Sequence, residues 1–274
     1  MFDKTAAKAV WGASPAGQAF GGTSAIGTRQ FFESVLAQRS DYEQPWLFEL
    51  VPFASYKGKR VLELGCGAGY DAYEFMRQGA NYTGIDITPE NIERVREHLG
   101  HFGLSPKVHE GDAENLPFAN ASFDIVYSNG VLHHTPDIAR SFAEARRVLR
   151  PGGTFWVILY HKHSIVYWVN IGLISHILGG RFLRQSFRHT IAKVEATTSD
   201  ALPIVNVYSR RDVSRLLREA GFHIEEMHVR KFVAEDLPPH PALLPLWRRV
   251  PQSVLRGIGR YLGWYVVARA SKPT

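Results

Sequence analysis

The chain contains a single cysteine, Cys66, among its 274 residues. A disulfide within the chain needs two cysteines, so a disulfide-stabilised framework is excluded, and so is a metal site built from several thiolates. The first residues, Met1-Phe2-Asp3-Lys4, lack the basic and then apolar pattern of a secretory signal. We therefore expect the protein to work in the reducing cytoplasm.

A long uninterrupted apolar run is absent as well. The longest apolar stretch, residues 164–183, is broken by Asn170, Ser175, His176 and Arg181. A membrane-spanning helix needs about 20 consecutive, predominantly apolar residues. This stretch is therefore predicted to be a helix that is buried in the protein or lies on an interface.

Acidic residues are too few to balance the basic ones, which leaves a formal net charge of +6. Such a bias attracts nucleic acid or an anionic membrane surface, but at this size it is more typical of a solvated surface. Much of the excess falls in residues 181–260. Hydrophobic residues make up 45% of the chain, which predicts a globular protein with a substantial core.

A glycine-rich turn between two short apolar runs is the most informative feature that is present. The first run, residues 61–64, contains Glu63, and the second run, residues 82–85, is followed by Asp86. Glycines come directly after the first run at alternate positions, namely Gly65, Gly67 and Gly69. This pattern predicts a strand, a tight turn, a helix and a second strand that ends in a carboxylate. Such a unit binds a nucleoside-bearing ligand at the carboxyl ends of parallel strands.

Strand and helix patterns alternate along most of the chain. We expect strands at 60–64, 82–86, 107–109, 123–128, 154–159, 222–228 and 264–268. Single helices between successive strands predict an α/β fold with a Rossmann-like, doubly wound sheet of seven strands. The last strand follows a loop rather than a crossover helix, so it is predicted to be antiparallel.

The chain is expected to consist of one core with additions. Residues 1–55 are predicted to form a leader, irregular up to residue 28, and then a helix, and residues 56–160 to form the ligand-binding core. Residues 161–208 break the strand–helix rhythm, which predicts a helical lid insertion. Residues 209–274 complete the core and carry a second, irregular and proline-rich insertion at 234–260.

Carboxylates around the glycine turn indicate the kind of ligand. Glu63 would repel a phosphate but suits a cation or an ammonium group, and the G-x-G-x-G spacing differs from the G-x-G-x-x-G of dinucleotide folds. Both points disfavour an NAD-dependent oxidoreductase. Asp86 can accept hydrogen bonds from ribose hydroxyls. Asp112, after the third strand, can accept from an adenine amino group, and the backbone N–H of Ala113 can face a ring nitrogen.

Further blocks at 111–118, 123–134 and 149–153 complete a recognisable order of motifs. With them the chain resembles the class I S-adenosylmethionine-dependent methyltransferases, in the broad group that includes quinone C-methyltransferases, over residues 61–159 and more weakly to residue 268. The resemblance implies that S-adenosyl-L-methionine is the cofactor and S-adenosyl-L-homocysteine the product. It also implies that residues 1–55 close over the cofactor and that the methyl group moves by in-line displacement.

The resemblance assigns roles to individual residues. The glycine turn, including the small buried Cys66, approaches the methionine half of the cofactor, and Glu63 orients its amino group. Asp86 holds the ribose, Ile87 packs near the adenine, and Asn129 lies beside the methyl group. The complete set of expected cofactor-binding residues is Glu63, Gly65, Cys66, Gly67, Gly69, Asp86, Ile87, Asp112, Ala113, Asn129, Arg39 and Tyr42.

A general base is needed when the methyl acceptor is a hydroxyl or an acidic carbon. His133 and His134 follow the fourth strand, and Tyr160 and His161 end the fifth strand on the ligand side of the sheet. We take these four residues as the catalytic candidates. A structural role is favoured for the histidine pair, and a place in the acceptor pocket for Tyr160 and His161. We expect no metal site, because these histidines have no diagnostic spacing.

Both insertions are rich in branched and aromatic residues, which predicts a small hydrophobic or aromatic acceptor. Whether its nucleophile is oxygen, carbon or nitrogen stays open. The arginines in residues 234–260 are compatible with a peripheral contact to an anionic membrane, and a homodimer contact is the other interpretation of this segment.

Two alternative functions stay open. One is an RNA-binding or RNA-methylating protein, and the other is an S-adenosylmethionine-binding enzyme with non-methylating chemistry. Nucleic acid is the disfavoured partner, because residues 128–131 read Ser-Asn-Gly-Val. Methylation of exocyclic amines in nucleic acids usually uses an Asn/Asp-Pro-Pro-aromatic block at that place.

Overall fold

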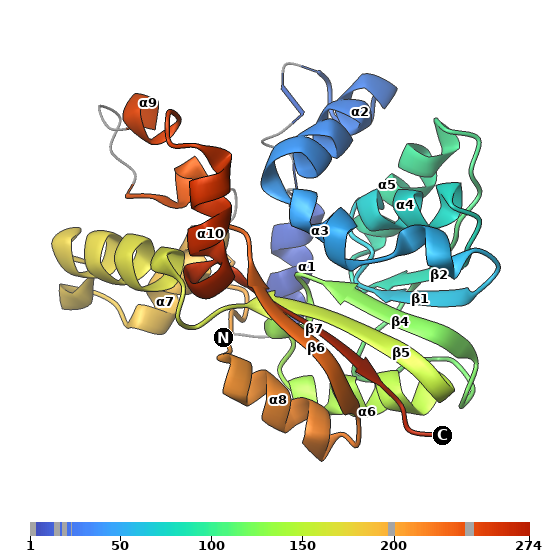
Figure 1. Cartoon of the computed structure of the whole chain (residues 1–274). Coiled ribbons are helices and arrows are strands. Elements are labelled where there is room, and N and C mark those ends of the chain that lie inside the picture. The colour runs from blue at the N-terminus through green and yellow to red at the C-terminus, as the bar shows by residue number, and fades with distance from the viewer. Residues whose placement is uncertain (1–3, 14–16, 18–20, 23, 197–200, 239–243) are drawn as a thin grey trace.

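A computed structural model describes the chain except for residues 1–3, 14–16, 18–20, 23, 197–200 and 239–243. Its centre is a seven-stranded sheet with the order β3-β2-β1-β4-β5-β7-β6. Helices cover both faces of this sheet, and the remaining segments gather at one end of it (Figure 1). The predicted Rossmann-like, doubly wound architecture is confirmed.

Most strands lie close to the predicted ranges, but β5 begins at Leu149, well before the predicted start at 154. The strands are β1 Arg60–Leu64, β2 Asn81–Asp86, β3 Lys107–Glu110, β4 Phe123–Asn129, β5 Leu149–Tyr160, β6 His223–Arg230 and β7 Tyr265–Ser271. β1 to β5 pair in parallel, whereas β7 pairs antiparallel with both β5 and β6. The antiparallel direction of the last strand is therefore confirmed.

The α-helices are α1 Lys4–Ala13, α2 Arg29–Gln38, α3 Pro45–Leu50, α4 Tyr70–Arg77, α5 Pro89–Gly100, α6 Ile138–Val148, α7 Phe187–Glu195, α8 Arg210–Glu219, α9 Leu244–Trp247 and α10 Gln252–Leu262. Helices of other types are η2 Arg39–Glu43, η3 Phe53–Tyr56, η4 Leu132–His134, η5 Val166–Leu178, η6 Arg181–Leu183 and η7 Ala234–Asp236. Of these, η2 and η5 are π-helices.

Alternating side chains of the strands build a separate core on each face of the sheet. In β5, Phe155 and Val157 pack with α6 and α8, whereas Trp156 and Ile158 pack on the face of α3, α4 and α5. In Figure 1, α6 and α8 lie below the sheet, and α4 and α5 lie on the opposite side. Burial on both faces fixes the register of the strands, because a slip by one residue would exchange the two cores.

Two segments are more ordered than predicted. The expectation of an irregular leader over residues 1–28 is wrong for Lys4–Ala13, which form α1 and bury Ala7 and Val10. The expectation of an irregular insertion at 234–260 is wrong for α10, which buries Leu255 and Gly259. Both helices take their stability from packing, a tertiary effect that local composition does not report.

The lid expected at 161–208 contains η5, η6 and α7. Tyr167 and Ile171 of η5 and Ile191 of α7 join Tyr160 and Trp264 in a third hydrophobic cluster. This cluster attaches the lid to the end of β5. In the part of the chain that the structure describes, no helix is long and apolar enough to cross a membrane.

Candidate active site

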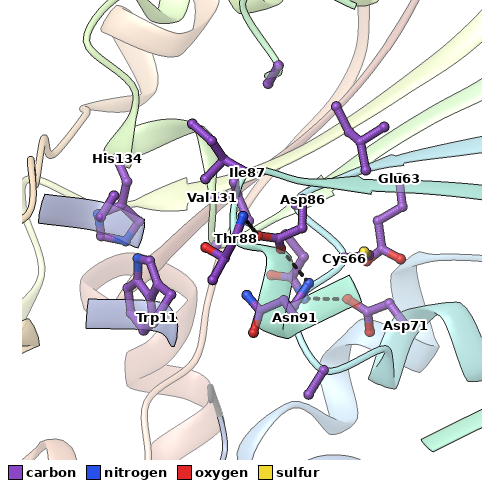
Figure 2. Close-up of a pocket in the computed structure, with 18 of the residues that line it drawn as sticks. Trp11, Glu63, Cys66, Asp71, Asp86, Ile87, Thr88, Asn91, Val131 and His134 are labelled. Carbon is purple, nitrogen blue, oxygen red and sulfur yellow. Dashed lines mark hydrogen bonds between the residues drawn. The ribbon is translucent and has the colours of Figure 1, made fainter. Parts of the chain in front are cut away.

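A cavity of about 380 Å³ lies at the carboxyl ends of the parallel strands. Its wall includes the last residues of β1, β2, β4 and β5, the glycine turn, and residues of α1 and η2. In Figure 2, Trp11 and His134 lie on one side, Glu63, Cys66 and Asp71 on the other, and Asp86, Thr88 and Asn91 between them. This is the place at which open α/β sheets bind their ligands.

The glycine turn needs its glycines for conformational and steric reasons. Gly65, Gly67 and Gly69 have φ angles of +79°, +53° and +80°, which side-chain-bearing residues rarely adopt. A Cβ atom on Gly65 would lie 2.4 Å from Val131. Gly65 and Gly67 line the cavity, whereas Gly69 caps α4 and lies outside its wall.

Asp86 joins the end of β2 to the glycine turn that follows β1. One of its carboxylate oxygens accepts from the backbone N–H of Gly67 at 2.8 Å, and the other from that of Thr88 at 2.9 Å. The side chain lines the cavity and is buried, and this burial raises its pKa. Asp86 therefore holds the turn in shape while its carboxylate faces the ligand space, as the predicted contact with ribose requires.

Glu63 is buried at the end of β1 and also lines the cavity. Its carboxylate accepts from the Tyr82 hydroxyl at 2.5 Å. Burial, and then the nearby charge of Asp71, raise the pKa of Glu63 well above its usual range. A positively charged ligand group in the cavity would stabilise the carboxylate form, which agrees with the predicted role of Glu63.

Asp71 has a larger role than its position in the first turn of α4 indicates. Its two oxygens accept from Arg39 at 2.8 Å, from the Tyr127 hydroxyl at 3.0 Å and from the Asn129 amide at 3.0 Å. The Arg39 guanidinium also donates to Gln44 at 3.0 Å. Arg39, Asp71 and Asn129 all line the cavity, so this network forms one wall of it. The local sequence shows only an acid in the first turn of a helix, which does not indicate this network.

His98 of α5 stabilises the glycine turn by a side-chain hydrogen bond. Its Nδ1 donates to the Ala68 carbonyl at 2.7 Å, and its ring stacks on Phe32 with centroids 4.0 Å apart. Burial lowers the pKa of His98 to about 4, so the ring is neutral at neutral pH. No pattern in the sequence distinguishes this residue from other polar positions of α5.

The predicted adenine end is covered by α1. Asp112, Ala113 and Ile87 line the cavity there, as the predicted adenine contacts require. Lys4 forms ion pairs with Asp112 at 2.6 Å and with Glu114 at 2.5 Å. α1 therefore closes this end of the cavity through a charged contact that the sequence did not predict.

Tyr42 does not reach the cavity. Its hydroxyl donates to Glu235 on the second insertion, and Tyr42 is not among the described residues that line the wall. The expected pair of contacts from the N-terminal side is therefore reduced to Arg39. Helical geometry explains the difference, because η2 is a π-helix with a wide turn, and residues three apart on it face different neighbours.

The four catalytic candidates divide into two pairs. Tyr160 and His134 line the cavity, whereas His133 and His161 are buried outside its described wall. His161 donates from Nδ1 to the Gly263 carbonyl at 3.0 Å, and the His133 ring packs on Tyr160 with centroids 3.7 Å apart. An acceptor in the cavity would not touch His133 or His161, so the geometry does not support a direct catalytic contact for them.

Three groups in the wall have polar atoms that are buried without a partner in the described part of the chain. These atoms are the Tyr70 hydroxyl, the Thr88 hydroxyl and Nε2 of His134. An unpaired buried polar group costs about 1–3 kcal/mol, so such atoms favour a polar ligand at this place. A Cβ on Gly67 would meet nothing within 4 Å, which leaves space for a ligand against the turn. The residues present therefore fit the cofactor that the resemblance implies.

We predict that Asp71→Asn lowers the free energy of unfolding by about 3–5 kcal/mol, because it leaves the buried Arg39 cation without its carboxylate. Glu33→Gln is the control, since Arg29 and Glu33 form an exposed pair at 2.8 Å whose loss costs less than about 1 kcal/mol. Urea denaturation of both variants measures the difference. Equal losses would contradict the importance of the Asp71 network.

Comparison with known proteins provides evidence that does not depend on the geometry of the cavity. A family model described as "Methyltransferase domain" matches residues 62–157. The chain is 38% identical over 175 residues to a ubiquinone biosynthesis O-methyltransferase from Aromatoleum aromaticum, a match that covers 64% of this chain and 68% of that protein.

Other relatives match over shorter stretches. A phthiotriol/phenolphthiotriol dimycocerosates methyltransferase from Mycobacterium leprae is 45% identical over 98 residues, which is 35% of this chain. The chain spans only 36% of that relative's length. A solved S-adenosylmethionine-dependent methyltransferase from Mesorhizobium loti has a TM-score of 0.56 at 20% identity, covering 83% of this chain and 96% of its own. At this identity the structural likeness shows the fold alone.

The family model matches the strands and turns that build the cavity, and the Aromatoleum relative extends the match well beyond them. The chain belongs to the S-adenosylmethionine-dependent methyltransferases, the family whose cofactor is S-adenosyl-L-methionine.

Proposed function

We propose that this protein transfers a methyl group from S-adenosyl-L-methionine to a small, largely apolar acceptor. The observation that carries the proposal is the cavity at the carboxyl edge of the sheet, where Glu63, Asp71 and Asp86 surround a glycine turn. When bound, the cofactor supplies a methyl group on a positively charged sulfur atom. Carboxylates in a poorly solvated cavity suit such a charge.

Each part of the wall has a proposed role toward the cofactor. Asp86 binds the ribose hydroxyls, and Asp112 and the Ala113 N–H bind the adenine edge. Glu63 and the Asp71 network orient the methionine amino group, and Asn129 lies next to the methyl group. The support is positional, since all of these residues line one continuous cavity.

The acceptor class rests on the insertions and on the relatives. The lid exposes large apolar side chains, among them Trp168, Leu178 and Leu183, and packs against the cavity residue Tyr160. The names of the two relatives describe methylation in ubiquinone biosynthesis and of phthiotriol dimycocerosates. Both observations support an acceptor that is hydrophobic or aromatic.

The proposal is tested by calorimetry with S-adenosyl-L-methionine and S-adenosyl-L-homocysteine, followed by labelled methyl transfer to a panel of quinol-like and isoprenoid acceptors. Gly67→Val should weaken binding of both ligands at least tenfold, because its side chain enters the cavity beside the turn. Gly103→Val is the matched control, since Gly103 has a φ of +70° and equally open surroundings but does not line the cavity. Absence of binding to the wild type would overturn the proposal.

We also propose that α1 closes over the bound cofactor. Lys4, Ala7 and Trp11 line the cavity, and Trp11 packs against His134 with centroids 5.3 Å apart. Lys4 pairs with Asp112 across the opening. Opening of α1 would therefore be required for exchange of the cofactor.

Lys4→Ala should accelerate dissociation of S-adenosyl-L-homocysteine about fivefold, which corresponds to about 1 kcal/mol for a partly exposed ion pair. Lys8→Ala is the control, because Lys8 pairs with Glu110 at 2.8 Å and does not line the cavity. Stopped-flow fluorescence of Trp11 can follow the release. Equal rates in the two variants would argue against closure by α1.

Within a cytoplasmic location, we propose that α10, which forms the end of the second insertion, contacts an anionic membrane surface. α10 buries Leu255 but exposes Val254, Tyr261 and Leu262, and its arginines are Arg256 and Arg260. An exposed apolar and basic helix face is typical of interfacial binding. These observations support a contact at the membrane surface.

The double variant Val254→Ser and Leu262→Ser should lose at least half of its binding to vesicles of phosphatidylcholine with phosphatidylglycerol. Ile26→Ser is the control, because Ile26 is similarly exposed on a separate segment. Co-sedimentation measures binding, and wild-type protein should not bind vesicles of phosphatidylcholine alone. Lipid-independent dimerisation through the same residues would favour the homodimer interpretation instead.

A further inference from the structure

Two carboxylates at the end of the cavity near Tyr160 have no ion-pair partner in the described part of the chain. Glu43 of η2 lines the cavity, and Glu195 is the last residue of α7 in the lid. The nearby cations are already paired, since Lys231 binds Asp236 at 2.7 Å and Arg39 binds Asp71. The proposed cofactor-binding residues leave both carboxylates without a function.

Glu195 is connected to the cavity by a hydrogen bond from one residue of the cavity wall, Tyr160. The Tyr160 hydroxyl donates to Oε2 of Glu195 at 3.2 Å, and Tyr160 itself lines the cavity. The Tyr160 ring stacks on Trp264 with centroids 4.3 Å apart and packs against His133. These contacts hold the hydroxyl between the cavity and the lid carboxylate.

The surroundings of Glu195 place the pKa of its carboxyl group near neutral pH. Burial raises the pKa of Glu195 to about 7, although the Tyr160 hydrogen bond and the charge of Lys231 act in the opposite direction. The titratable and charged groups around Tyr160, Tyr265 and Glu195 come from several elements, and they are Glu43, Arg39, His133, Tyr265, Lys231 and Asp236. The carboxyl group can therefore gain or lose a proton near neutral pH.

Resting on the function proposed above, we infer that Tyr160 and Glu195 form a relay that removes the proton from a hydroxyl-bearing methyl acceptor. The acceptor oxygen would lie against the Tyr160 hydroxyl, on the cavity side. This assigns the acceptor to the class of phenols and enols, whose nucleophilic oxygen carries a proton before transfer.

The transfer balances in atoms and charge. The oxygen–carbon bond forms as the sulfur–carbon bond breaks, and the electron pair of that bond stays on sulfur. The hydroxyl proton passes to the Tyr160 oxygen while the Tyr160 proton passes to Oε2 of Glu195. One positive charge and one carboxylate charge disappear together, which is favourable in a medium of low dielectric constant.

The relay has a consequence that does not need an acceptor. The positive charge of bound S-adenosyl-L-methionine stabilises the carboxylate form of Glu195 and so lowers its pKa, whereas S-adenosyl-L-homocysteine lacks this charge. Near pH 7 only the charged ligand should therefore displace protons from Glu195. Its affinity relative to the uncharged ligand should rise with pH between about 6 and 8, by tenfold for each unit of pKa shift.

Proton release is measured by titration calorimetry of the whole protein at pH 7 in two buffers with different ionisation enthalpies. Wild-type protein should release more protons on binding S-adenosyl-L-methionine than on binding S-adenosyl-L-homocysteine, because both ligands carry the amino group that faces Glu63 but only the first carries the sulfonium charge. Glu195→Gln, which keeps the hydrogen-bond acceptor for Tyr160, should abolish the difference, and Glu43→Gln should retain it. Equal proton release for both ligands, or a difference between them that persists in Glu195→Gln, would overturn the inference while leaving the proposed function intact.

The hydroxyl acceptor is tested separately with 4-nitrocatechol, whose absorption spectrum changes when a hydroxyl ionises. The protein is loaded with sinefungin, an unreactive analogue that carries an amine in place of the sulfonium. Bound probe should be more ionised at pH 6 than free probe in the wild type, and equal to free probe in Glu195→Gln and Tyr160→Phe. An unchanged spectrum in the wild type would contradict proton removal by the relay, and failure to bind any cofactor would instead reject the proposed function itself.

Discussion

The buried ion pair between Arg39 and Asp71 is the constraint on which the wall of the cavity depends. It joins the N-terminal segment to the first turn of α4, and the same carboxylate accepts from Tyr127 and Asn129 of β4. A buried charge pair is tolerated only when further hydrogen bonds compensate for lost hydration. Since the network satisfies that condition, three separate parts of the chain meet at a defined place beside the glycine turn.

The cavity that results is strongly acidic. Glu43, Glu63 and Asp86 line it, and burial raises the pKa of each. Desolvation of like charges is costly, so a cationic ligand is the partner that relieves the cost most directly. The same electrostatic condition connects the cofactor site with the relay, because removal of the ligand's charge makes protonation of a nearby carboxyl group favourable.

The sheet and the insertions have different roles. The sheet provides a rigid wall, and the insertions contact the residue that we expect to face the acceptor. Residues at the ends of β1, β2 and β4 come from strands buried on both faces, and they form the wall proposed to hold the cofactor. Tyr160, at the end of β5, contacts both this wall and the lid cluster. An insertion that packs on such a residue can change the acceptor without disturbing the core, in agreement with the location of functional variation in loops.

The sequence by itself determined the α/β class, the seven strands, the glycine turn and the carboxylate at Asp86. These features depend on periodicity and spacing within short segments, which a single sequence displays directly. Only the tertiary structure decided that Asp71 accepts hydrogen bonds from three side chains and that His133 lies outside the cavity. It also decided that Lys4 of α1 lines the cavity and that Glu195 of the lid contacts the cavity residue Tyr160. Their partners lie far away in sequence, and packing rather than local pattern brings them together.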